Sequence, residues 1–328
     1  MKILISGGAG YIGSHTLKQF LETNHEICVL DNLSKGSKIA LDDLQKIKKF
    51  KFFEQDLSDF MGVKEIFKQE KFDAVVHFAA SIEVPESMQN PLKYYMNNTV
   101  NTTNLIQTCI ENNTNNFIFS STAATYGEPQ NSVVNENSSL APINPYGMSK
   151  LMSEKVLKDA NMAHPEFKYC ILRYFNVAGA CNTYPIGQRY PKATLLIKVA
   201  AECAAGKRDK LFIFGDDYNT KDGTCIRDYI HVDDISSAHL AGLEYLQNNQ
   251  SDIFNVGYGH GFSVKEVIET MKKVSGVDFK VELAPRRAGD PSVLISDASK
   301  IRSKTSWKPK YDDLELICKS AYEWEKQC

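Results

Sequence analysis

The N-terminal segment constrains the fold more strongly than any other part of the sequence. A short apolar run at Lys2–Ser6 leads into the glycine-rich segment GGAGYIG (7–13), and a helical pattern follows through residues 17–21. Glycines in such a turn let the backbone approach a pyrophosphate, and the N-terminus of the next helix then faces the negative charge. The order of strand, turn and helix therefore predicts a dinucleotide site at Gly7, Gly10 and Gly13.

Asp31 follows the second predicted strand, Glu26–Leu30. A carboxylate at this position accepts hydrogen bonds from both ribose hydroxyls of an adenosine and repels a 2′-phosphate. The sequence therefore favours NAD over NADP as the cofactor. The alternative is a structural glycine turn followed by an incidental aspartate.

Strand and helix patterns alternate through the first half of the chain. Further strands are expected at Lys51–Glu54, Asp73–Phe78, Phe117–Ser120, Tyr169–Tyr174 and, returning to the sheet, Asp252–Val256. This alternation predicts an α/β fold, with a doubly wound parallel Rossmann sheet and a smaller α/β substrate-binding lobe. We assign residues 1–176 and a returning segment near 233–257 to the NAD-binding domain, and residues 177–232 and 258–328 to the smaller lobe. Between the fourth and fifth strands we expect a loop to Pro91 and one helix over Leu92–Asn112.

Tyr146 and Lys150 lie four residues apart in a segment with a helical pattern. Positions i and i+4 share one face of a helix, so the phenol is expected against the ammonium, whose charge lowers the pKa of the tyrosine. A tyrosine so tuned acts as a general base near neutral pH. The alternative is an ordinary helical turn after Asn144-Pro145.

Thr122 lies beyond the carboxyl end of the predicted strand Phe117–Ser120, where ligands bind in doubly wound sheets. Its hydroxyl can bond the same substrate oxygen that Tyr146 would deprotonate. The alternative is a threonine that satisfies local backbone groups.

Composition limits the partners of the chain. The 328 residues carry a formal net charge of −2, which gives no support to nucleic acid or an anionic membrane as a partner. No apolar run approaches the ~18 residues of a membrane span. The eight cysteines include no CxxC pair and the seven histidines show no HxxxH spacing. We therefore expect reduced thiols, a cytoplasmic location and no metal site.

The glycine turn, the Ser/Thr-rich segment ending in Tyr-Gly and the YxxxK pair together resemble the extended short-chain dehydrogenase/reductase superfamily. Further segments make the chain similar to the UDP-hexose 4-epimerases, and they span nearly its whole length. These segments are HFAA (77–80), FSSTAATYG (119–127), NPYGMSK (144–150), RYFNVAGA (173–180), IFGDDYNTKDGTCIRDYIHV (213–232) and PRRAGDPS (285–292).

The resemblance implies a mechanism and a set of roles. Tyr146 resembles the family's base, which removes the proton of the sugar 4-hydroxyl while C4 gives hydride to the nicotinamide. Lys150 is expected to hold the nicotinamide ribose and, with the positive ring, to keep Tyr146 ionised. Thr122 stands where the family usually has serine. The 4-keto sugar turns over in the pocket and takes hydride back on its other face, so NAD is regenerated in each cycle.

The resemblance also implies which residues contact each ligand. The residues expected at the cofactor are Gly7, Gly10, Tyr11, Ile12, Gly13, Asp31, Asn32, Leu33, Ser34, Lys35, Gly36, Asp56, Leu57, Phe78, Ala79, Ala80, Ser81, Ile82, Asn97, Thr122, Tyr146, Lys150 and Phe175. The residues expected at the UDP-sugar are Thr122, Tyr146, Asn176, Thr194, Leu195, Phe212, Ile213, Phe214, Arg227, Arg287, Asp290 and Leu294.

Among these, Arg227 and Arg287 would clamp the diphosphate. Ile82 departs from the lysine that many members carry there, which puts one cofactor contact in doubt.

Leu294 is the departure that bears on substrate choice. Relatives restricted to UDP-glucose and UDP-galactose often carry a tyrosine here, beside the 2-substituent of the sugar. Leucine is smaller, so we expect the enzyme to interconvert UDP-GlcNAc and UDP-GalNAc as well.

Three other functions share parts of this pattern. A 4,6-dehydratase needs an acid and a base directly after Thr122, where this chain has Ala123 and Ala124. A dehydrogenase would release NADH with each UDP-sugar. A non-catalytic NAD or sugar sensor commonly loses the base. By analogy with the family we also expect a homodimer, paired through helices near Leu92–Asn112 and Tyr146–Lys158.

Overall fold

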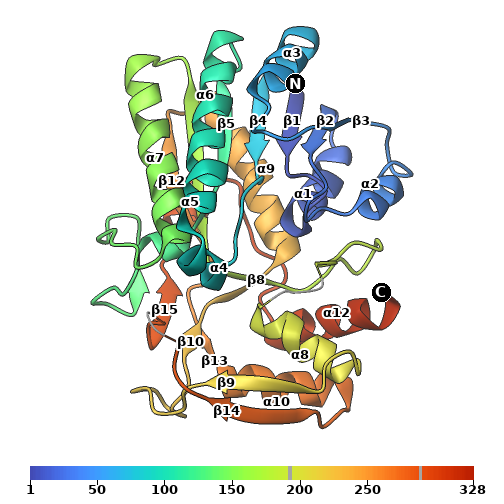
Figure 1. The fold of residues 1–328 in the computed structure, drawn as a ribbon, viewed down its shortest axis with the longest axis vertical. Coiled ribbons are helices and arrows are strands. Elements are labelled where there is room, and N and C mark those ends of the chain that lie inside the picture. Colours follow the sequence, from blue (N-terminus) through green and yellow to red (C-terminus); the bar gives the residue numbers. More distant parts are fainter. Residues whose placement is uncertain (191–193, 288–289) are drawn as a thin grey trace.

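The computed structural model describes residues 1–190, 194–287 and 290–328 of the chain. The strands of its larger lobe are β1 (Lys2–Ser6), β2 (Glu26–Asp31), β3 (Lys51–Glu54), β4 (Ala74–His77), β5 (Asn116–Thr122), β7 (Lys168–Tyr174) and β12 (Asp252–Val256). They form one parallel sheet in the order β12-β7-β5-β4-β1-β2-β3. The predicted α/β fold with a doubly wound parallel sheet is confirmed (Figure 1).

Helices cover both faces of this sheet. Successive strand residues point to opposite faces, so Ile3 and Ile5 of β1 pack into one apolar core while Leu4 packs into the other. Helices α1 (Tyr11–Leu21), α2 (Lys38–Leu44) and α9 (Val232–Asn248) contribute to the first core. Helices α3 (Phe60–Glu70), α6 (Asn101–Glu111) and α7 (Pro145–Ala163) contribute to the second, and α6 and α7 stand side by side in Figure 1.

The smaller lobe lies beneath the sheet in Figure 1. It contains the parallel strand pairs β8 (Asn176–Ala178) with β11 (Tyr229–His231), and β9 (Lys210–Phe214) with β14 (Lys280–Ala284). A further sheet has the order β13 (Phe262–Ser263), β10 (Ile226–Arg227), β15 (Val293–Ser296) and β6 (Val133–Val134). Its helices are α8 (Leu196–Ala204), α10 (Val264–Ser275), α11 (Ser299–Lys304) and α12 (Leu314–Gln327).

The segment between β4 and β5 differs from the prediction. The expected loop contains helix α4 (Val84–Gln89), and the expected single helix is α5 (Pro91–Tyr94), the π-helix η1 (Tyr95–Val100) and then α6. Prolines in the first turns of α4 and α5 are compatible with helix starts because their missing N–H would be unpaired there. The π-turn presents Asn97 and Asn98, whose amides donate to Ser81 Oγ (3.2 Å) and Ser81 O (2.9 Å). These contacts are tertiary, so helical periodicity did not predict them.

Within the described residues, no helix is both long and apolar enough to cross a lipid bilayer. Residues 288 and 289, which belong to the PRRAGDPS segment, lie outside the described ranges.

Candidate active site

A cavity of about 830 Å³ lies beyond the carboxyl ends of the central strands, where the strand order reverses. Its size is within the ordinary range for ligand pockets. Gly7 and Asp31 follow or end strands of the sheet, and both line the cavity. Leu195, Arg227 and Leu294 of the smaller lobe close the other side. The site therefore lies between the two lobes.

The residues predicted to contact the dinucleotide all line this cavity except Leu33. Leu33 has a positive φ of 56°, and its backbone N–H donates to Asp31 Oδ1 over 2.8 Å. Its contribution is therefore to the turn that holds Asp31.

The residues predicted to contact the sugar nucleotide divide into two groups. Those on the cavity wall are Thr122, Tyr146, Asn176, Leu195, Arg227, Asp290 and Leu294. Those off the wall, as far as the structure describes it, are Thr194, Phe212, Ile213, Phe214 and Arg287. Ile213 packs into the apolar core, and the guanidinium of Arg287 lies 3.7 Å from the ring centre of Phe214. The assignment of β9 to the nucleotide-sugar side therefore stays a prediction, since its residues do not line the described wall.

Sequence reasoning missed one part of the wall. Gln188, Arg189 and Tyr190 line the cavity from the segment between β8 and α8, for which the sequence carries no periodic signal. The Lys35 ammonium lies 4.4 Å from the ring centre of Tyr190 and also pairs with the Glu83 carboxylate. Lys35 thus joins three segments beside the cavity.

The glycine turn leaves backbone donors available at the start of α1. Gly7 has a φ of +76°, and a Cβ there would lie 2.6 Å from Ala79 N. A Cβ at Gly13 would lie 2.1 Å from Gly7 O, so this packing requires glycine at both positions. Gly10 is the N-cap of α1 and, within the described residues, no side chain caps that end. The free N–H groups of the first turn form a site suited to phosphate oxygens.

Asp31 ends β2 beside this turn. Its carboxylate accepts hydrogen bonds from the backbone N–H of Ala9 (3.0 Å) and of Leu33 (2.8 Å). Burial raises the pKa of Asp31, and these two hydrogen bonds oppose the change. The oxygens retain further lone pairs that can accept hydroxyl groups of a ligand.

Strand β5 and helix α7 bring Thr122, Tyr146 and Lys150 together at the cavity. Helix α7 begins after Asn144, whose side chain accepts the N–H of Gly147 over 2.8 Å. The Thr122 hydroxyl lies near the Tyr146 phenol and opposes the rise in its pKa, and its oxygen also accepts the N–H of Ala124 over 3.1 Å. Thr122 therefore both satisfies a local backbone N–H and faces the cavity.

The predicted fall in the pKa of Tyr146 beside Lys150 was wrong. Lys150 Nζ donates to Ser120 O over 2.9 Å, and burial raises the pKa of Tyr146 rather than lowering it. Burial also lowers the pKa of Lys150 to about 7. A dry environment disfavours both charged forms, and the i, i+4 spacing did not reveal the strand carbonyl that binds the ammonium.

Tyr94 supports the Tyr146 ring from the side. The two rings are 6.4 Å apart in an edge-to-face arrangement, and Tyr94 is fully buried. Its hydroxyl donates to Glu83 O (2.7 Å) and accepts from Glu83 N (3.0 Å). The contact ties α5 to the loop that carries Ile82 into the cavity.

Arg227 and Leu294 form the wall on the smaller lobe. Arg227 forms an ion pair with Asp290, and the backbone partners of β10 and β15 place it beside Leu294. Leu294 is 8% exposed and packs in a small cluster with Tyr126 and Phe175. Its side chain therefore bounds the space available to a ligand.

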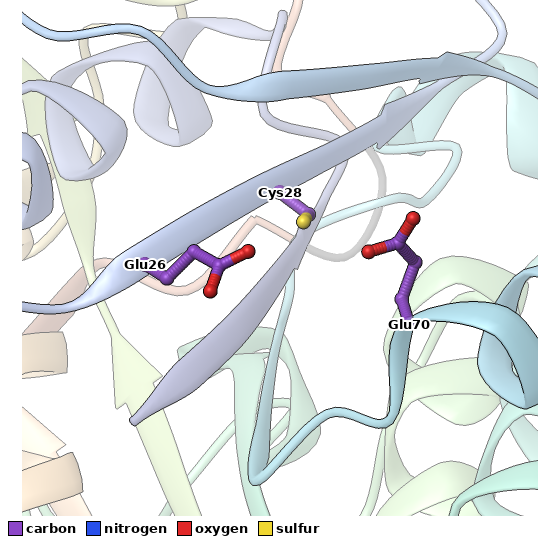
Figure 2. A group of neighbouring side chains, drawn as sticks. All are labelled: Glu26, Cys28 and Glu70. Atoms are coloured by element: carbon purple, nitrogen blue, oxygen red, sulfur yellow. The ribbon is translucent and has the colours of Figure 1, made fainter.

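Outside the cavity, Glu26, Cys28 and Glu70 form a cluster of side chains of metal-ligand types, near the amino end of β2 (Figure 2). Lys2 Nζ lies 3.0 Å from Glu26 Oε1 and 2.5 Å from Glu70 Oε2, and Lys51 also pairs with Glu70. Burial raises the pKa of Cys28 to about 11, so its thiol stays protonated at neutral pH. The cluster is part of an ion-pair network near the amino ends of β1 and β2.

Comparison with known proteins identifies the family. Residues 3–257 match the model of the NAD dependent epimerase/dehydratase family. A UDP-glucose 4-epimerase of Lacticaseibacillus casei is 45% identical over 99% of this chain and 97% of its own length. The chain belongs to the UDP-hexose 4-epimerase family of the extended short-chain dehydrogenase/reductase superfamily.

Solved structures agree with this assignment. The UDP-Glc/GlcNAc 4-epimerase of Campylobacter jejuni is 83% identical, with a TM-score of 0.89 and coverage of 100% of this chain and 99% of that one. The Bifidobacterium longum UDP-glucose 4-epimerase, solved with NAD⁺ and UDP, is 34% identical with a TM-score of 0.95 and coverage of 100% and 98%. The family predicted from the motifs is confirmed.

The structure also bears on the dehydratase alternative within this epimerase/dehydratase family. Ala123 and Ala124 lie on the cavity wall directly after Thr122. Their methyl groups exchange no protons, so the acid and base that dehydration requires are missing from these two positions of the described wall. The same two alanines suit an epimerase, which eliminates no water.

The buried Lys150 predicts a pH-dependent stability. Its folded pKa of about 7 lies below the unfolded value of 10.5, so the unfolded chain binds more protons between these values. We expect the free energy of unfolding of nucleotide-free protein to rise above pH 7, by up to about 1.4 kcal/mol per pH unit relative to Lys150→Met. Urea unfolding from pH 6 to 9 measures this difference. If the free energies of unfolding of the two proteins differed by a constant amount across that range, the lowered pKa of Lys150 would be contradicted.

Proposed function

We propose that the protein interconverts UDP-glucose and UDP-galactose with a bound NAD, through a transient 4-keto sugar. The observation that carries the proposal is the shared cavity: Tyr146, Lys150 and Thr122 face the same space as the glycine turn and Asp31. A proton-transfer group and a dinucleotide cradle are thus within reach of one substrate. Family membership supports the same reaction.

The residues of the cavity fit NAD. Donors at the uncapped start of α1 suit the pyrophosphate, and Asp31 suits the two hydroxyls of the adenosine ribose. Lys150 can reach the nicotinamide ribose if it exchanges its Ser120 O contact for a ribose hydroxyl. NAD held by these residues would supply a hydride acceptor and donor for C4 of the sugar.

The protein's own side chains handle the proton. Tyr146 removes the proton of the sugar 4-hydroxyl, and the Thr122 hydroxyl donates to the oxygen that becomes the ketone. The Thr122 hydroxyl opposes the rise in the pKa of Tyr146 that burial causes, and positive charge on Lys150 is proposed to favour the phenolate further. Arg227 and Arg287 are proposed to bind the diphosphate. For Arg287 this requires movement toward the cavity, because it stacks on Phe214 in the protein alone.

A Tyr146→Phe variant tests the reaction. The ring keeps its packing against Tyr94 but loses its acidic hydroxyl, so we expect epimerase activity to fall by roughly 10²–10⁴-fold while bound NAD is retained. Conversion of UDP-glucose is measured beside the dinucleotide released on denaturation. Tyr245→Phe is the matched control, because its hydroxyl bonds Asp252 away from the cavity. Near-normal activity in Tyr146→Phe, or stoichiometric NADH release by the unaltered enzyme, would contradict the proposal.

We extend the proposal to the N-acetylated pair, UDP-GlcNAc and UDP-GalNAc. Leu294 bounds the cavity with a side chain smaller than tyrosine. The Campylobacter jejuni protein, 83% identical to this chain, is a UDP-Glc/GlcNAc 4-epimerase. Both observations support a pocket that admits a 2-acetamido group.

Leu294→Tyr should separate the two substrate pairs. The added ring fills space beside Phe175, so we expect the rate on UDP-GlcNAc to fall about tenfold or more relative to that on UDP-glucose. Leu294→Met, which keeps the volume, should leave the ratio near that of the unaltered enzyme. Ratios of kcat/KM for the two sugars, from one preparation of each protein, measure the effect. An unchanged ratio in Leu294→Tyr would show that this residue does not act as the gate.

We also propose a cytoplasmic homodimer, in which residues 1–176 with 233–257 bind NAD and the rest of the chain binds the nucleotide sugar. The described cysteines are all free thiols, which suits a reducing compartment. Apolar side chains are exposed along α4, α5 and η1, with Met88 61%, Leu92 72% and Met96 59% exposed. Together with Met152 of α7 they suit a helix-to-helix subunit contact.

Leu92→Glu should disrupt that dimer. A carboxylate placed in an apolar contact loses its hydration, so we expect the molar mass at micromolar concentration to fall to that of one chain. Met61→Glu on α3, where the side chain is 74% exposed on another helix, is the matched control and should remain dimeric. Light scattering coupled to gel filtration makes the measurement. A monomeric unaltered protein, or a dimeric Leu92→Glu, would argue against this interface.

A further inference from the structure

Helix α7 carries a third ionisable residue at the spacing of Tyr146 and Lys150. Glu154 follows Lys150 by four residues, so the three share one face of the helix. The Glu154 side chain is fully buried, unlike most glutamates. A buried carboxylate at this position requires partners and a reason to be there.

The partners of Glu154 come from the two strands beneath α7. Ser121 Oγ donates to Glu154 Oε1 over 2.5 Å. Arg173 of β7 donates from Nε to the same oxygen (2.9 Å) and from Nη2 to Oε2 (2.5 Å). This two-pronged contact is the geometry in which arginine holds a carboxylate most firmly. Arg173 also donates to the Tyr126 hydroxyl (3.1 Å), which in turn donates to Asn255 Oδ1 (2.6 Å).

Stability alone gives little reason for this arrangement. Removing two charges from water offsets much of their attraction, and apolar replacements of buried ion pairs are often neutral or stabilising. The neighbouring Lys150 suggests another role. Strand β5 binds both side chains in succession, Lys150 through Ser120 O and Glu154 through Ser121 Oγ.

Among the described residues that act on Lys150, Glu154 is charged and the others are neutral. From β5 it meets the Ser120 carbonyl and the Phe119 ring, 4.8 Å away. His77 of β4 also acts on it electrostatically, but burial lowers the pKa of this histidine to about 3, so it is neutral. Tyr146 is neutral in the protein alone because its pKa is raised.

We propose that Glu154 is a positioning residue whose carboxylate, held by Arg173 and Ser121, keeps Lys150 in its ammonium form and so sets the upper pH limit of Tyr146 as a base. The inference rests on the proposed function, since it concerns the same proton transfer. Burial lowers the pKa of Lys150 to about 7, and the charge on Glu154 is the influence that opposes this fall. Arg173 contributes by holding both carboxylate oxygens of Glu154 in place.

The test removes the charge of the Glu154 side chain and keeps its size and shape. In Glu154→Gln holoenzyme we expect the alkaline limb of kcat/KM to move to lower pH by about one unit or more, with NAD content unchanged. Glu154→Asp keeps the charge and should bring the limb back toward that of the unaltered enzyme. An unmoved limb in soluble Glu154→Gln would overturn the proposal.

A second readout does not depend on activity. Selective ¹³C labelling of the lysine Cε groups, with the Lys150 signal assigned by its absence in Lys150→Met, gives the Lys150 titration directly. We expect its midpoint in the holoenzyme to fall in Glu154→Gln by the same shift, and an unchanged midpoint would overturn the inference. If the unaltered enzyme showed no epimerase activity, the proposed function would fail while this titration still decided the role of Glu154.

If Glu154→Gln does not fold, a double variant can replace it in the test. Glu154→Leu with Arg173→Leu removes both charges and leaves an apolar pair in their place. An acidward shift of the Lys150 midpoint is expected there too, smaller than in Glu154→Gln because the repulsion by Arg173 is lost together with the carboxylate. A midpoint equal to that of the unaltered protein would overturn the proposal.

Discussion

The contact between β5 and α7 is the interaction on which the proposed chemistry depends. Three consecutive strand residues meet three helix residues spaced by four: Ser120 O binds Lys150, Ser121 binds Glu154, and the Thr122 hydroxyl lies near the Tyr146 phenol. The pairing of β5 with β7 aligns Ser121 with Arg173, which places the guanidinium against Glu154. A slip of one residue would turn these side chains to the other face of the sheet. The sheet register therefore fixes the positions of the catalytic groups.

Burial acts against the charges that the proposed mechanism uses. In the protein alone it raises the pKa of Tyr146 and lowers that of Lys150, so both groups tend toward their neutral forms. A dinucleotide with a positive nicotinamide ring adds a charge that favours the phenolate. The negative charge of Glu154 opposes the fall in the pKa of Lys150, and Tyr94 packs against the ring of Tyr146. The reactive protonation states thus depend on the loaded site as well as on the chain.

Local signals account for what the sequence predicted well. Short-range rules predicted the glycine turn, the position of Asp31 and the strands of the sheet. Turn geometry and strand periodicity depend on residues that are neighbours in the sequence. The partner of Lys150 was missed because it is a strand carbonyl set by sheet register, and the π-turn was missed because its amides bond a distant loop. Phe212 and Phe214 were predicted at the substrate from motif similarity, and they do not line the described wall of the cavity, so this contact stays a prediction.

The central claim is that Tyr146 moves only the hydroxyl proton, while the hydrogen on C4 leaves and returns inside one closed site. The most direct measurement uses UDP-glucose carrying deuterium at C4, with the purified enzyme in ordinary water and the UDP-galactose product examined by mass spectrometry and NMR. The account predicts that the product retains the deuterium at C4. Loss of the label to water, which would mean that C4 gives up a proton rather than a hydride, would contradict it.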